Sequence, residues 1–185
     1  MAPVKDLFET WNLYCQDESR FGLFTRNGRG LTAKGIKPIC PFQQKFLNTY
    51  LYGAFSPITG DSFILDLPTC DTDNFQLFLD ELSDFNPTEF KVVMLDNGSF
   101  HKAIRLSIPK NICLIFLPPY SPELNPAEKI WAILKKSIEL KSFKTLEDLQ
   151  TVLYEEIKKK LTQDRIKQTT GFDFLLSTFW TIMNI

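Results

Sequence analysis

The sequence predicts an α/β fold in which an antiparallel hairpin region is joined to parallel strands and helices cover the sheet. Three observations favour this class. Two β-rich aromatic runs flank a turn at 56–61, two later runs are continuously apolar, and three segments repeat apolar residues at helical spacing. A chain of 185 residues, 44% of them hydrophobic, can bury a core without disulfides, so we expect residues 1–185 to form a single domain.

The first third of the chain predicts four strands. A β-prone run from Leu7 to Gln16 stops at Asp17, and Phe21–Phe24 is expected as a short second strand. After a basic loop, Lys45–Phe55 and Ser62–Leu67 are separated by a turn that contains Pro and Gly. This arrangement predicts a hairpin.

The next segment predicts one helix and two buried strands. Asp71 or Thr72 can cap a helix. Its apolar residues, spaced i, i+3, i+4 and i+7, are Phe75, Phe78, Leu79 and Leu82. The runs Phe90–Leu95 and Ile112–Leu117 are continuously apolar, which is typical of strands buried on both faces.

The last part of the chain predicts helices after a rigid loop. Four prolines within nine residues exclude regular structure before Asn125, which is expected to cap a helix that opens at Pro126. Thr145 is expected to start a second helix, and 162–169 a shorter one. The apolar tail 172–185 should pack on the core or on a partner.

Composition excludes several classes of protein. The longest apolar run has six residues, whereas a membrane-spanning helix needs about 20, and residues 1–6 lack the apolar core of a signal peptide. The four cysteines are widely spaced and the chain has one His, so neither a zinc ribbon nor a disulfide framework fits. We therefore expect buried, reduced thiols in a cytoplasmic protein with no membrane partner.

Charge is unevenly distributed, although the formal net charge is only −1. Between Glu18 and Asp61 there is no acidic residue. The six basic residues of that segment are Arg20, Arg26, Arg29, Lys34, Lys37 and Lys45. The block 97–122 also lacks acids and includes Lys102 and Arg105. Either block alone could be ordinary solvated surface, but together they set a few carboxylates in positive surroundings, as a phosphate-handling site requires.

Three acidic residues occupy positions suited to catalysis. Asp17 and Asp96 each follow a predicted strand, and Glu128 lies at the start of the helix after the proline loop. Carboxylates gathered at the carboxyl ends of strands could chelate Mg²⁺ or Mn²⁺, which prefer oxygen ligands. Simpler interpretations are open: the two aspartates could be turn residues, and Glu128 could reach back to cap its helix.

Two motifs carry a family resemblance. They are DNGSFH at 96–101 and LPPYSPELNPAEKIW at 117–131. Together with QDESRFG at 16–22, they closely resemble the DDE transposases of bacterial insertion sequences related to mariner elements. The resemblance covers nearly the whole chain.

The resemblance implies an RNase H-like fold with a mixed central sheet flanked by helices. It also implies two Mg²⁺ ions, with Mn²⁺ as an alternative, and phosphoryl transfer that nicks transposon ends and joins the freed 3′-hydroxyl to target DNA. Asp17, Asp96 and Glu128 match the catalytic, metal-binding acids of the family. The expected partners are double-stranded DNA, at the transposon ends and the target, and a second copy of the chain, in the cytoplasm or nucleoid of a bacterium.

Other positions receive roles from the same resemblance. His101 falls on the family's DNxxxH position, where it either hydrogen-bonds the scissile phosphate or is a buried structural residue. Asn97 and Asn125 are expected to orient the two motifs, and Trp131 is expected in the core. The expected contacts to the DNA backbone are Arg26, Arg29, Lys34, Lys37, Lys102 and Arg105.

One departure from the family pattern concerns DNA recognition. Members carry an N-terminal helix-turn-helix region, whereas only 16 residues precede Asp17 here. We expect that region to be encoded separately, or this chain to be a fragment.

Two other functions stay open. One is a domesticated or decayed relative that acts only as a DNA-binding or interaction module, and the other is an RNase H-like nuclease that hydrolyses without strand transfer. Retention of all three acids favours an enzyme, because a pure binder does not need carboxylates that repel phosphate.

Overall fold

A long central strand, β1, organises the sheet. The structure, a computed structural model, describes residues 7–24, 33–36 and 42–183. β1 (Thr10–Gly22) pairs in antiparallel fashion with β2 (Asn48–Phe55) and in parallel with β4 (Glu89–Leu95). With β3 (Ser62–Leu67) and β5 (Ile112–Phe116) at the edges, the strand order is β3-β2-β1-β4-β5. The predicted α/β class with a mixed sheet is confirmed.

β2 and β3 form the predicted hairpin. The Ser56 N–H donates to the carbonyl oxygen of Asp61 at 2.8 Å, which closes the turn. Gly60 has a φ of +80°, and a Cβ there would lie 2.4 Å from the backbone oxygen of Gln163. Only glycine fits this position, because it tolerates positive φ and has no side chain to collide with the neighbouring backbone.

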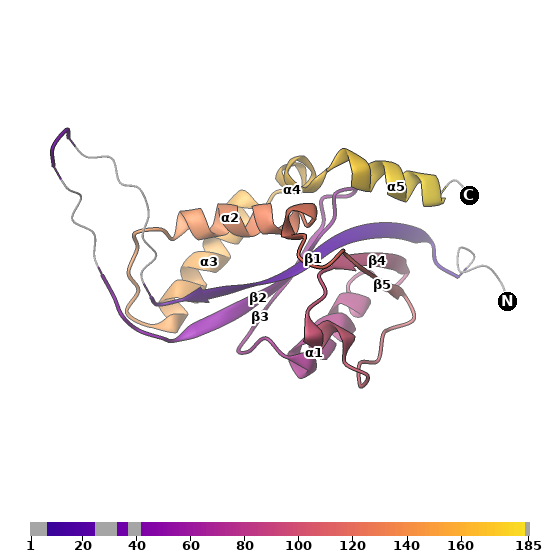
Figure 1. The fold of residues 1–185 in the computed structure, drawn as a ribbon, viewed down its shortest axis with the longest axis horizontal. Coiled ribbons are helices and arrows are strands. Elements are labelled where there is room, and N and C mark those ends of the chain that lie inside the picture. The colour runs from indigo at the N-terminus through magenta and orange to yellow at the C-terminus, as the bar shows by residue number, and fades with distance from the viewer. Residues whose placement is uncertain (1–6, 25–32, 37–41, 184–185) are drawn as a thin grey trace.

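Helices cover both faces of the sheet (Figure 1). α1 (Thr72–Asp84) lies on one face, and Asp71 caps it by accepting a hydrogen bond from the Asn74 N–H at 3.0 Å. The helices on the opposite face are α2 (Ala127–Ser137), α3 (Leu146–Lys160), α4 (Gln163–Thr170) and α5 (Asp173–Met183). The sheet is therefore the middle of three layers.

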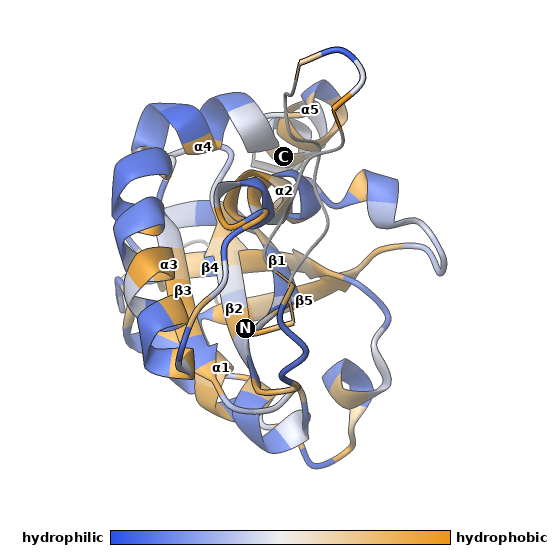
Figure 2. Ribbon diagram, turned by 90° about the vertical axis from the view of Figure 1, so that its left-hand side faces the viewer, coloured by the Kyte–Doolittle hydropathy of each residue, from blue (hydrophilic) through white to orange (hydrophobic). Residues whose placement is uncertain are grey.

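Alternate side chains of β1 contribute to two hydrophobic cores. Leu13 and Cys15 pack with residues of α2 to α5, whereas Tyr14 packs with residues of α1. Successive side chains of a strand point to opposite faces, so one strand supplies both cores. Figure 2 shows hydrophobic residues along the strands and hydrophilic ones on much of the helices' outer surface. Burial on both faces holds β1 and β4 in place.

β1 is longer than predicted. The run 21–24 is not a separate strand: β2 continues to pair with β1 as far as Gly22, which lies opposite Asn48. Asp17 therefore lies inside a strand rather than at its end. Pairing with β4 stops where Cys15 lies opposite Met94, so Asp17 still comes just beyond the parallel part of the sheet.

The apolar tail packs on the core, as expected. Within α5, Leu175 and Phe179 are buried in the cluster that also contains residues of α2 and α3. In the described ranges, no helix is both long and apolar enough to cross a membrane.

The prediction of buried thiols is only partly correct. Cys15 is buried, but Cys70 and Cys113 are exposed, and all three are free. Cys70 lies in the connection between β3 and α1, and Cys113 lies on the edge strand β5, where fewer side chains cover it. Cys40 lies outside the described residues.

Gly53 leaves space for a tryptophan that reaches the middle of the sheet. It lies opposite Asp17 in the β1–β2 register, and Trp131 of α2 is fully buried against it. A Cβ at Gly53 would lie 2.6 Å from Cη2 of Trp131 and 2.6 Å from Cζ of Phe55. Alanine at this position must therefore displace an aromatic ring.

We predict that Gly53→Ala lowers the free energy of unfolding by about 1–3 kcal/mol, the usual cost of overpacking a core. Urea unfolding followed by circular dichroism measures this change. A Trp131→Phe background removes one of the two close contacts, so the same substitution should cost less there, with Phe55 still limiting the space. An equal cost in both backgrounds would show that the indole ring does not limit this position.

Candidate active site

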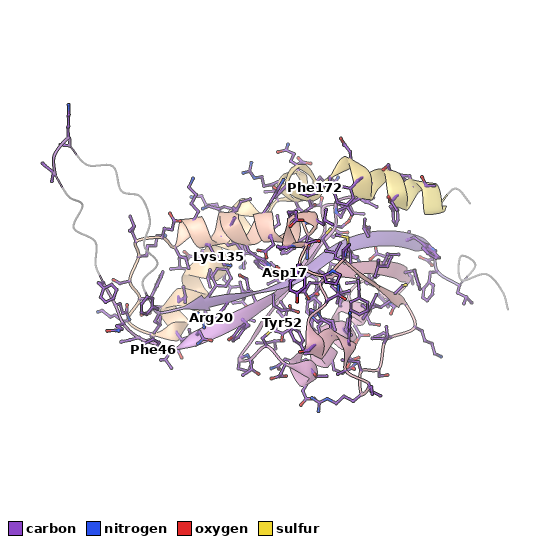
Figure 3. All side chains as sticks on the ribbon, in the orientation of Figure 1. Asp17, Arg20, Phe46, Tyr52, Lys135 and Phe172 are labelled. Carbon is purple, nitrogen blue, oxygen red and sulfur yellow. The ribbon has the colours of Figure 1, made fainter. Side chains whose placement is uncertain are left out.

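One pocket of about 440 Å³ collects the residues that the sequence singles out. Its wall includes the three predicted acids Asp17, Asp96 and Glu128, together with Asn97 and Asn125. Figure 3 shows Asp17 midway along β1, below α2. Among the residues that the structure describes, no Lys or Arg lines the pocket. The pocket wall therefore concentrates negative charge.

Asp17 is held by an indole from α2. Trp131 Nε1 donates a hydrogen bond to Asp17 Oδ2 at 3.0 Å, and Trp131 itself is completely buried. Its ring packs edge-on against Phe55 and Phe21, with centroids 5.2 and 6.3 Å away. The predicted core position of Trp131 is confirmed. Helical spacing could not have revealed the hydrogen bond, because it depends on how α2 docks on the sheet.

The carboxyl of Asp17 is in an unfavourable place for a negative charge. Burial, and then the charges of Glu18, Glu128 and Asp96, raise its pKa to about 8. A divalent cation in the pocket would reverse this effect, because it stabilises the ionised form of each carboxylate near it. The three carboxylates of the pocket wall offer oxygen ligands of the kind that a hard cation such as Mg²⁺ or Mn²⁺ prefers.

The pocket is not a preassembled metal site. Within the described parts of the chain, no group of three or more His, Cys, Asp or Glu side chains is close enough together to hold an ion. One oxygen of Asp96 faces His101, and Glu128 is exposed in the first turn of α2. To bind one cation together, these carboxylates would therefore have to move toward one another from their positions on the pocket wall.

Asp96 follows β4 and is restrained through one oxygen. The Gly98 N–H donates to Asp96 Oδ1 at 2.8 Å, and His101 Nδ1 lies 2.8 Å from the same oxygen. The second contact is close but is not aligned as a hydrogen bond. The side chain of Asn97 donates to the carbonyl of Leu117 and so connects the ends of β4 and β5.

His101 is not on the pocket wall. It lies in a single-turn helix, Ser99–Lys102, where it is 2% exposed and its Nε2 lies 3.1 Å from Glu18 Oε1. Of its two expected roles, this burial favours the structural one. Glu18 was not predicted as a site residue. It follows Asp17 along β1, so its side chain points to the opposite face, and no pattern in the sequence marks that contact.

The proline loop brings Glu128 to the pocket. Asn125 Nδ2 donates to the backbone oxygen of Gln16 at 2.8 Å, which anchors the loop to β1. The predicted cap is supported: α2 is assigned from Ala127, but Pro126 already has helical dihedral angles, Asn125 is extended, and Asn125 Oδ1 accepts a hydrogen bond from the Ala127 N–H at 3.2 Å. The capping interpretation of Glu128 loses support, because the Asn125 N–H that a capping carboxylate would accept from donates instead to the carbonyl oxygen of Pro122 at 2.9 Å.

The predicted contacts to the DNA backbone are only partly described. Those outside the described residues are Arg26, Arg29 and Lys37. Lys34 is exposed, and Lys102 donates to Asn97 Oδ1 beside the pocket. Arg105 Nη2 lies 2.9 Å from Asp73 Oδ1 in an exposed ion pair. Of the expected DNA contacts that the structure describes, Lys102 is the one hydrogen-bonded directly to a pocket residue.

Sequence comparisons match this chain to known proteins. A family model described as "DDE superfamily endonuclease" matches residues 12–150. A curated protein of Sinorhizobium fredii, "Uncharacterized protein y4pE/y4sA", is 38% identical over 104 residues, which are 55% of this chain and 77% of that protein.

The fold is similar to solved structures of Mos1 transposase. The Mos1 paired-end complex with the left transposon end matches with a TM-score of 0.68 and 16% identity, over 86% of this chain and 51% of that chain. The Mos1 mariner paired-end complex with Mn matches with a TM-score of 0.66 and 16% identity, over 85% and 51%. This chain spans about half the length of those chains. The similarity confirms the predicted RNase H-like fold.

We predict that Asp17 makes the metal-free protein less stable as pH rises. Its pKa is about 8 in the folded protein and about 4 in an unfolded chain. Its stabilising contribution is therefore complete below about pH 4 and is lost as the pH rises through about 8. Asp17→Asn should gain stability relative to the parent between about pH 5 and pH 8, by more than about 1 kcal/mol.

Urea unfolding in the presence of a chelator measures this difference. Glu123→Gln is a matched control, because Glu123 is exposed and does not line the pocket. Its stability should differ from that of the parent far less than the stability of Asp17→Asn does. A stability difference between Asp17→Asn and the parent that stays flat with pH would contradict the raised pKa.

Proposed function

The chain belongs to the family described as DDE superfamily endonuclease, and on this premise we propose that it is the catalytic domain of a DNA transposase. The proposed reaction is divalent-metal-dependent cleavage of DNA, followed by transfer of the freed 3′-hydroxyl to target DNA. One observation carries the proposal: the acids of the three motifs, delivered by β1, β4 and α2, lie on the wall of one pocket.

In this proposal Asp17, Asp96 and Glu128 hold two divalent cations, Mg²⁺ or Mn²⁺. When bound, such ions activate the attacking water or hydroxyl and stabilise the leaving oxygen. Two observations support this assignment. The raised pKa of Asp17 reflects burial and then the neighbouring carboxylates, and a cation would offset both effects. Solved Mos1 complexes are described as containing Mn or Mg.

Three polar side chains position the acids. Trp131 restrains one oxygen of Asp17 by its hydrogen bond. Asn125 fastens the proline loop, and with it the start of α2, to β1. Asn97 connects the ends of β4 and β5 beside Asp96. These contacts agree with the expectation that the two asparagines orient the motifs.

Double-stranded DNA is the proposed substrate, both at the transposon ends and at the target. The Mos1 structures are described as a paired-end complex with a transposon end and a strand transfer complex. Lys34 and Lys102 would contact phosphates, together with the basic residues outside the described ranges. We further propose that the chain acts as a homodimer in bacterial cytoplasm, with end sequences read by a helix-turn-helix region encoded separately or on a longer polypeptide.

We predict that Glu128→Gln abolishes Mg²⁺-dependent nicking of a transposon-end duplex, with a loss of several orders of magnitude. A neutral amide compensates far less of the ion's dehydration, and a bound ion can supply several kcal/mol of barrier reduction. Melting temperature without metal should stay nearly unchanged, because Glu128 is exposed and does not accept the hydrogen bond of the Asn125 N–H. Glu123→Gln, the matched control, should nick at the parent rate.

Single-turnover nicking on denaturing gels measures the rate, and a pre-cleaved end tests joining. Nicking by Glu128→Gln at nearly the parent rate would contradict its assignment as the third acid. A parent that nicks but forms no joined product would indicate a nuclease without strand transfer. No divalent-dependent cleavage on any end sequence would favour a DNA-binding module.

A further inference from the structure

Behind the pocket, a chain of contacts connects Glu18 to Asp96 through His101. Glu18 Oε1 lies 3.1 Å from His101 Nε2, and His101 Nδ1 lies 2.8 Å from Asp96 Oδ1. The side chains of Glu18 and His101 are only 7% and 1% exposed, whereas that of Asp96 is 59% exposed. The contacts therefore lead from the interior of the fold to the pocket wall.

The imidazole ring has little freedom to turn. Its centroid lies 4.4 Å from that of Phe75 and 4.1 Å from that of Phe100. Gly98 also borders the ring: a Cβ there would lie 3.0 Å from His101 Nδ1 and 3.1 Å from Asp96 Oδ1. The absence of a side chain at Gly98 allows the ring and the carboxylate to approach each other.

The carboxylate of Glu18 is itself oriented. Gln16 Nε2 donates to Glu18 Oε1 at 2.7 Å, and Gln16 is fully buried. The backbone oxygen of Gln16 accepts the hydrogen bond from Asn125 that anchors the proline loop. The segment of β1 that orients Glu18 is thus also fastened to the loop that leads to Glu128.

A carboxylate at position 18 has an electrostatic cost. It is nearly buried, and among the neighbouring charges it contributes most to the unfavourable environment of Asp17. Glutamine could accept the same hydrogen bond from His101 without that repulsion. A carboxylate can only accept hydrogen bonds, so in this contact Nε2 must be the donor. The amide of glutamine can present either its oxygen or its NH₂ group to the ring, so it specifies the ring's orientation less strictly.

We propose that Glu18 and His101 are positioning residues for Asp96. Glu18 fixes the direction of the ring, and the ring, together with the Gly98 N–H, holds Asp96 Oδ1 so that Oδ2 is the oxygen offered to a cation. This inference rests on the proposed function, in which Asp96 is a metal ligand. Hydrogen-bonding partners behind metal ligands typically contribute about 10–100-fold to metal affinity or activity.

Binding of Mn²⁺ without DNA, followed by electron paramagnetic resonance, tests the proposal directly. Glu18→Gln should weaken Mn²⁺ binding about 10–100-fold. Glu18→Asp, which keeps the charge but is one methylene shorter, should also weaken it. Because Glu18 acts through His101, the double variant Glu18→Gln/His101→Asn should bind no more weakly than His101→Asn alone.

Glu89→Gln is the matched control. Glu89 is also a buried carboxylate, and it accepts hydrogen bonds from Asn12 Nδ2 and the Tyr14 hydroxyl, both at 2.9 Å. It lies at the start of β4, at the opposite end of the strand from Asp96. Glu89→Gln should lower the melting temperature but bind Mn²⁺ with the parent affinity. Loss of Mn²⁺ affinity in both variants would show a general effect of buried carboxylates and would overturn the positioning role.

The chain has one His, so ¹⁵N NMR of the labelled imidazole gives one set of ring signals. In the parent we expect the Nδ1 signal to shift when Mg²⁺ is added, because this nitrogen lies 2.8 Å from Asp96 Oδ1. An Nδ1 signal that does not respond to Mg²⁺ would overturn the proposal even if Glu18→Gln fails to fold.

The outcomes separate the inference from the proposed function. Parent-like Mn²⁺ affinity in Glu18→Gln overturns the positioning role and leaves the proposed function in place. A parent that neither binds Mn²⁺ nor cleaves DNA overturns the proposed function and the inference together.

Discussion

The parallel pairing of β1 with β4 is the constraint on which the site depends. Their last paired residues are Cys15 and Met94, and Asp17 and Asp96 each follow two positions later. Because the two strands are parallel, two residues further along each strand brings both aspartates to the same end of the sheet. β2 keeps Asp17 within an extended strand, while β4 ends at Leu95 and frees the chain around Asp96 to turn. Two hydrophobic cores, one on each face, hold this register.

Placing several carboxylates near one end of the sheet opposes folding. Neighbouring residues restrain each of these acids separately. Trp131 holds Asp17, and the space that Gly53 leaves lets the indole reach it. Gly98 and His101 hold Asp96. The restraint on the third acid is indirect, through the hydrogen bond from Asn125 to β1. Each restraint belongs to the rigid sheet or to a loop fastened to it, so the geometry does not require a flexible lid.

Elements with a strong local signal could be predicted from the sequence. The observed strand β4 consists of the predicted apolar run 90–95 and one further residue, Glu89. Thr145 caps α3, as predicted, and forms a capping box with Asp148. Asp96 and Glu128 were identified through motifs that are contiguous in sequence, and the structure brings both to the pocket. These features depend on neighbours along the chain.

Features set by tertiary contacts could not be predicted in the same way. The length of β1 depends on its partner β2, which propensity does not report. The contact of Glu18 with His101 joins residues 83 positions apart, and the hydrogen bond from Trp131 to Asp17 joins residues 114 apart. The exposure of Cys113 follows from the position of β5 at the sheet edge.

Diffraction from Mn²⁺-soaked crystals at the manganese absorption edge tests most directly whether the three acids form a metal site. The account predicts an anomalous peak in the pocket between the carboxylates of Asp17 and Asp96, with the side chain of Glu128 turned toward it. A peak elsewhere, or an empty pocket at Mn²⁺ concentrations that support DNA cleavage, would contradict it.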